Sequence, residues 1–187
     1  MVVLTVVKEA GVNGKTLIAA LVLWVVGLMP LPAAADFVFS LDDKTLVTKS
    51  AVAVLTDEFF GGRTNALRVL FTPETLTAQQ QQERAREDWR KLTKDYAVVV
   101  LFLDKSNRIT QVNITVVIPG QTVVRTVAYK QPELGTFAAG YSYDGKRLKL
   151  RNKGSFTEAT PGMAPIKLGW DMDVDAPVVD RLGAAKK

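Results

Sequence analysis

The stretch that decides the fold is residues 96–129, YAVVVLFLDKSNRITQVNITVVIPGQTVVRTVAY. It begins with an apolar run at 97–103, and a polar break at 104–107 ends that run. Residues 108–118 then alternate between apolar and polar side chains, and residues 122–128 are again rich in Val and Thr. Runs of this length that are bounded by turn residues predict three consecutive strands of an antiparallel meander.

The two breaks have the chemistry of tight turns. Asp104 and Asn107 are residue types that hydrogen-bond their own backbone, and Gly120 accepts the positive φ of a type II turn that Pro119 favours. A run that is apolar at every position suits a strand covered on both faces, whereas an alternating run suits a strand with one wet face. Tyr96–Leu103 is therefore predicted to be the central strand.

Short strands are expected on both sides of the meander, with Gly61-Gly62 and Asp144-Gly145 as hairpin connections. These further strands are residues 37–41, 45–48, 51–55, 66–71, 136–143, 146–151 and 170–175. We expect an α+β fold, namely a mainly antiparallel sheet of about eight or nine strands that is curved or folded into a sandwich, with one inserted helix.

That helix is predicted near residues 77–94. Thr77 and Gln80 fit a capping box, and residues 78–94 contain no Gly or Pro. The apolar positions Ala85, Trp89 and Leu92 form only a narrow stripe, which predicts that the helix lies on the sheet with Trp89 as its main anchor. The alternative is a helix whose 79–86 face, including Arg86, is recognised by a partner protein.

The composition excludes several classes of chemistry. The 187-residue chain has no cysteine and no histidine, so disulfides, thiolate catalysis, Cys-based zinc sites and Ser-His-Asp triads cannot occur within it. The formal net charge is +5, with 24 basic and 19 acidic residues scattered along the chain, which indicates a mixed, solvated surface. We expect neither a cofactor nor an enzymatic activity.

The first 35 residues have the order of a secretory signal peptide. Lys8 and Lys15 precede an apolar run at 17–29, and Pro30 follows it. The run is thirteen residues long, below the roughly 20 needed to cross a bilayer. Ala33 and Ala35 are the small residues expected at positions −3 and −1 of a cleavage site, so cleavage is predicted between Ala35 and residue 36. Residues 36–187 would then form a single β-rich domain, in the periplasm or outside the cell, without a membrane span. The competing interpretation is an uncleaved anchor.

Two rows of charge alternate along the strands near the C-terminus. Their members are Arg147, Lys149, Arg151 and Lys153 in the basic row, and Asp171, Asp173 and Asp175 in the acidic row. One interpretation places the rows side by side, so that opposite charges pair across two strands. The other is that the acidic row binds a cation such as Ca²⁺, although neighbours on one strand face stand about 7 Å apart.

A polyanion-binding face is a further interpretation, because Tyr141 and Tyr143 are near the basic row and interleaved basic and aromatic residues bind anionic polymers. An exported protein rarely meets nucleic acid, so an envelope protein or an anionic or apolar envelope component is the expected partner. The candidate interaction residues are Arg86, Trp89, Tyr141, Tyr143, Arg147, Lys149 and Arg151.

Three functions compete at this point. The first is a non-catalytic binding protein of a bacterial-type cell envelope, which recognises its partner through a sheet edge or the helix. The second is a carrier of an apolar small ligand held between the helix and the curved sheet. The third is an enzyme that uses carboxylates alone, drawn from Asp57-Glu58 and the acidic row.

Overall fold

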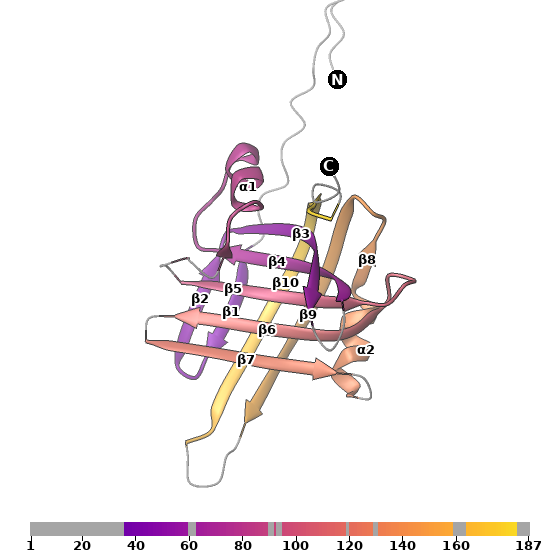
Figure 1. The fold of residues 1–187 in the computed structure, drawn as a ribbon. Helices are drawn as coiled ribbons and strands as arrows, with labels where there is room; N and C mark the ends of the chain where they lie inside the picture. Colours follow the sequence, from indigo (N-terminus) through magenta and orange to yellow (C-terminus); the bar gives the residue numbers. More distant parts are fainter. Residues whose placement is uncertain are drawn as a thin grey trace, which may run out of the picture. The chain divides into compact units, whose positions relative to one another are not determined.

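The computed structural model describes residues 36–59, 63–89, 92, 95–118, 120–128, 131–158 and 164–182. These residues form ten strands and two helices (Figure 1). The fold is therefore of the predicted β-rich α+β class, but the expected numbers of strands and helices were too low. The predicted signal peptide lies outside the described residues.

Five strands form a meander that we call sheet B, in which each strand is antiparallel to the next. They are β3 (Ser50–Phe59), β4 (Arg63–Thr72), β5 (Tyr96–Leu103), β6 (Ile109–Ile118) and β7 (Gln121–Ala128). The three strands predicted from residues 96–129 are confirmed, and β5 is buried at every position after Tyr96. Asn107 and Gly120 have positive φ, of 59° and 78°, as the predicted turns require.

The other five strands form sheet A, in the order β2, β1, β10, β9, β8. They are β1 (Phe37–Leu41), β2 (Lys44–Thr48), β8 (Tyr141–Tyr143), β9 (Arg147–Glu158) and β10 (Ile166–Asp180). β10 joins the sheets, because residues 178–180 leave the neighbourhood of β1 and pair in parallel with β3. The strand order ends at β2 and β7, so the sheet formed by the described strands does not close on itself.

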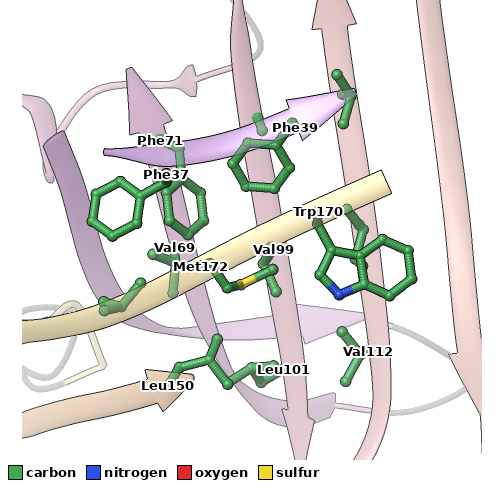
Figure 2. Close-up of a cluster of buried hydrophobic side chains, with 14 of the residues drawn as sticks. Phe37, Phe39, Val69, Phe71, Val99, Leu101, Val112, Leu150, Trp170 and Met172 are labelled. Carbon is green, nitrogen blue, oxygen red and sulfur yellow. The ribbon is translucent and has the colours of Figure 1, made fainter. Parts of the chain in front are cut away.

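The core lies between the two sheets, where β9 and β10 cross β4–β7 steeply (Figure 1). Phe37 and Phe39 of β1 pack edge-on against Phe71 of β4, with ring centroids 5.1 and 4.9 Å apart. Figure 2 shows this cluster together with Met172 and Trp170 of β10. Aromatic pairs in this geometry add to the stability that burial provides.

A second apolar cluster lies on the other side of sheet B, where Ala85 and Trp89, which follow α1 (Ala78–Arg84), pack on the strands. The predicted capping box of Thr77 and Gln80 is confirmed. The predicted extent of the helix is wrong, because α1 ends at Arg84 instead of continuing to residue 94. The Trp89 indole N–H donates to the Arg84 carbonyl oxygen at 2.7 Å. The last carbonyl group of α1 is therefore satisfied by a side chain that follows the helix.

The segment predicted as a connection and a strand at 131–143 is mostly helix α2 (Pro132–Ala139), so that prediction is wrong. Pro132 has the fixed φ that suits a first helical turn, and the acidic Glu133 follows it near the positive end of the helix dipole. Phe137 is fully buried and stacks on Trp170, with 6.0 Å between the ring centroids. The contact of Phe137 with Trp170 thus anchors α2 on the core. The strand predicted at 136–143 is reduced to the three residues of β8.

Candidate functional site

The candidate interaction residues fall in three places, not in one patch. Arg147, Lys149 and Arg151 occupy alternate, exposed positions of β9, on the face of sheet A that points away from the core. The two tyrosines of β8 lie on the opposite face of the same sheet, and Arg86 and Trp89 follow α1 on sheet B. The three β9 residues share one exposed face, so one ligand can contact all three.

The polyanion-binding face that would combine the tyrosines with the basic row is not formed. Tyr141 pairs with Leu150 and Tyr143 pairs with Leu148, and paired residues of antiparallel strands share a face. Both tyrosines therefore pack against the core. The Tyr141 hydroxyl donates to the Asn107 carbonyl oxygen at 3.0 Å, and burial raises the pKa of Tyr141 to about 12.

The basic row of β9 and the acidic row of β10 lie side by side, as the pairing interpretation predicted. The strand register places Lys153 opposite Asp171, Arg151 opposite Asp173 and Lys149 opposite Asp175. Ion pairs join Lys153 to Asp171 at 2.6 Å, Arg151 to Asp173 at 3.7 Å, and Arg147 diagonally to Asp175 at 2.5 Å. We call these seven residues the charge ladder.

The interpretation that the acidic row binds Ca²⁺ is wrong, because the ion pairs direct its carboxylates to the basic row. Each acidic side chain of the ladder is directed to a basic neighbour, and no group of three or more acidic residues that could hold a metal ion occurs in the described ranges. The ladder side chains in these pairs are between 48% and 82% exposed. Exposed pairs of this kind contribute less than about 1 kcal/mol each to stability.

An open hollow of about 490 Å³ adjoins the end of the ladder, between β1, β10 and β9. It is lined by Val38, Ser40, Lys153, Gly154, Ser155, Gly169, Trp170 and Asp171. Gly169 makes the space, because it stands between Ser40 and Ser155 on neighbouring strands and carries no side chain. A Cβ at Gly169 would lie 2.5 Å from the Ser40 hydroxyl oxygen. Hydroxyl groups, a valine and one ion pair thus surround a site that can accept a polar or small apolar group.

Sequence reasoning missed this hollow. The available signal was a glycine within an alternating strand, which often marks a close approach of another group. The partners that form the walls, Ser40 and Ser155, are 129 and 14 residues away from Gly169 by their positions in the chain. Only the register of three strands brings them together.

Trp89 is buried, with 4% of its surface exposed, so it is an anchor as predicted and is not available as a contact residue in this conformation. Arg86 is exposed just beyond the end of α1. Of the candidate residues, the helix side therefore offers one exposed basic side chain, that of Arg86, whereas β9 offers a row of three.

In the described ranges, no helix is long and apolar enough to cross a membrane. Comparison of the chain with protein families, with curated proteins and with solved structures found no match.

Proposed function

We propose that the protein is a non-catalytic binding protein of a bacterial-type cell envelope, located in the periplasm or secreted, and that it holds a partner protein against the charge ladder and the hollow. The observation that carries this proposal is the ladder itself. Its side chains are exposed, and three cross-strand ion pairs join six of the seven, so a partner would meet a row of alternating charges with a defined spacing.

The charge of this face indicates the character of the partner. With Lys167, which is exposed on the same face of β10, the basic side chains exceed the acidic ones by two. A partner surface with a small acidic excess would be complementary, and such complementarity gives specificity and faster association. The hollow next to Lys153 would receive one side chain of that partner.

The hollow does not favour the carboxylate-only enzyme. Hydrolysis of a glycosidic bond requires two carboxyl groups on opposite sides of the reacting bond. Among the residues that line the hollow, Asp171 is the one carboxylate, and Lys153 is bound to it at 2.6 Å. A binding function uses the same residues without requiring a second acid.

Site-specific photo-crosslinking in the host envelope tests the proposal. A photoreactive amino acid replaces Lys149 or Ser155 on the proposed surface, or Arg86 beyond α1 as the matched control. We expect a protein crosslink from positions 149 and 155 and none from position 86. A crosslink from position 86 with none from the other two would transfer the function to the helix side and contradict the proposal.

A paired variant separates loss of binding from loss of folding. R151D combined with D173R keeps an opposite-charge pair across β9 and β10 but reverses its orientation. We expect this variant to fold like the natural protein and to lose the crosslinks. Retention of full crosslinking would show that the ladder does not recognise the partner.

A further inference from the structure

The outer face of sheet B is apolar beneath the segment formed by residues 77–89, which we call the cover segment. The buried residues of this face come from three neighbouring strands and are Val52, Val54, Ala66, Leu70, Val98, Val100 and Phe102. Ala85 and Trp89 of the cover segment belong to this cluster, and four partly buried residues also pack against it, namely Leu76, Leu92, Tyr96 and Val179. Arg68 of β4 lies on the same face, opposite Val54 and Val100 in the strand register. The surface beneath the cover segment is therefore apolar with one cation within it.

The helical part of the cover segment adds little to its attachment. None of the seven residues of α1 is buried, so burial in this segment comes from Ala85 and Trp89, which follow the helix. A short helix with no buried face is marginal in water. Elements with few buried apolar contacts open locally at lower free energy than the core of the same protein.

Arg181 fastens the cover segment to the end of β10. Its guanidinium donates to the Ala85 carbonyl oxygen at 2.6 Å and to the Glu87 carbonyl oxygen at 2.8 Å. The backbone N–H of Arg181 donates to the Leu55 carbonyl oxygen at 2.9 Å, which fixes Arg181 to sheet B. Arg181 thus ties the cover segment to sheet B from outside the segment.

Two guanidinium groups lie against the Trp89 ring. Arg68 of β4 is 5.4 Å from the ring centroid and Arg181 is 6.0 Å from it. Burial and the charge of Arg68 lower the pKa of Arg181, while the Asp88 carboxylate opposes this shift. The cover segment therefore brings an apolar ring and a neighbouring negative charge to an apolar face that holds Arg68 within it and Arg181 beside β3.

We propose that the cover segment lifts from sheet B and that the uncovered face binds an anionic amphiphile with a single acyl chain, of the long-chain carboxylate class. The acyl chain would replace Trp89 on the valine, leucine and phenylalanine side chains, and the carboxylate would replace Asp88 beside Arg68 and Arg181. Arginine pairs well with carboxylates because its planar fork donates two parallel hydrogen bonds. This site lies on sheet B and does not depend on the partner surface proposed for sheet A.

Hydrogen exchange with dodecanoate as the probe tests this inference on the protein purified from its host. The backbone N–H groups of Gln81 and Ala85 donate within the cover segment, to Thr77 and Gln81, and report whether α1 is folded. A helix with no buried face is marginal once the segment is detached, so their exchange also follows detachment. We expect saturating dodecanoate to speed their exchange at least about tenfold, with no change at β5 and β6. We expect 1-dodecanol, which has the same chain without the charge, to bind more weakly and to give a smaller effect.

The variant R181Q tests the attachment, and R147Q on sheet A is its matched control. We expect R181Q to speed exchange at Gln81 and Ala85 without any ligand and to reduce the preference for dodecanoate over 1-dodecanol, and we expect R147Q to do neither. If R181Q does not fold, R181K keeps the charge but loses the two-carbonyl contact and serves in its place. Equal binding of the two probes, or binding that leaves the cover segment protected, would overturn the inference.

Discussion

Single residues set the closest approaches in this fold, and glycine is required where two backbones meet. At Gly140, the residue after α2, a Cβ would lie 1.9 Å from the Arg151 carbonyl oxygen, which is a backbone atom and cannot move aside. Arg151 also donates its N–H to the Gly140 carbonyl oxygen at 2.9 Å. The approach of α2 to β9 thus depends on the absence of a side chain.

We therefore expect G140A to lower the free energy of unfolding by about 1–3 kcal/mol, the usual cost of overpacking. Gly135 provides the control in the same helix, because a Cβ there would have no atom within 4 Å. G135A should stabilise the protein slightly, since alanine favours helix over glycine. Urea denaturation of the two variants measures both effects, and equal values would contradict the close approach.

Tyr141 couples the stability of the protein to alkaline pH. Burial, and then the charges of Tyr143 and Asp104, raise the pKa of Tyr141 to about 12, compared with about 10 for tyrosine in an unfolded chain. Because the folded state favours the protonated phenol, this stabilisation is complete below pH 10 and is lost as the pH rises towards 12.

We expect the free energy of unfolding of the natural protein to fall between pH 10 and pH 12, and that of Y141F to fall less steeply. At neutral pH, Y141F should be less stable by about 1 kcal/mol, because the hydrogen bond to Asn107 is lost. Denaturation curves at several pH values check both statements. An identical pH dependence of the two proteins would show that Tyr141 is not the group responsible.

At the scale of elements, local patterns predicted the meander and the charge ladder. Residues 96–129 contain both the apolar pattern of the strands and the residues of the turns between them. The alternation of charged and apolar residues in β9 and β10 is likewise visible within each strand. The helix α2 could not be predicted in this way. Residues 136–140 lack a clear period, and Phe137 is buried among core residues that are distant in the sequence, such as Trp170, which is 33 positions away and is stacked on it.

The candidate site was likewise predictable where it depends on patterns within single strands, and not where it depends on how the strands align. The pairing of opposite charges followed from two alternating strands, whereas the placement of Tyr141 and Tyr143 depended on the register of β8 against β9. The hollow required three strands in register, and the end of α1 was set by hydrogen bonds from Trp89 and Arg181. These features depend on contacts between residues far apart in the sequence.

The ladder should affect recognition more than stability. A double-mutant cycle with K153A and D171A measures the coupling of a pair that is directly opposed in the register and whose atoms are 2.6 Å apart. We expect a coupling below about 1 kcal/mol that decreases with added salt, because both groups are exposed. A coupling of several kcal/mol that does not respond to salt would show that the ladder has a mainly structural role.

At the scale of the whole molecule, β10 makes the two sheets cooperative. It pairs with β9 over residues 166–177, with β1 over 168–171 and with β3 over 178–180. The final turn after this strand then fastens the cover segment through Arg181. The last described residues of the chain therefore contact both halves of the fold.

Truncation after Pro177 should lower the free energy of unfolding by at least about 3 kcal/mol. It removes the pairing of β10 with β3, the apolar packing of Val178 and Val179, and the Arg181 hydrogen bonds. Truncation after Leu182 keeps all the described contacts and is the control. Thermal unfolding followed by circular dichroism compares the two chains. Equal midpoints would mean that the junction does not couple the sheets.

The most direct test of the proposed function is native mass spectrometry of the protein and two variants, purified gently from the host envelope. One variant carries K149Q and R151Q on the charge ladder, and the other carries R86Q beyond α1. We expect the natural protein and R86Q to retain a bound protein partner, and the ladder variant to lose it. Retention of the partner by the ladder variant together with its loss from R86Q would contradict recognition by sheet A.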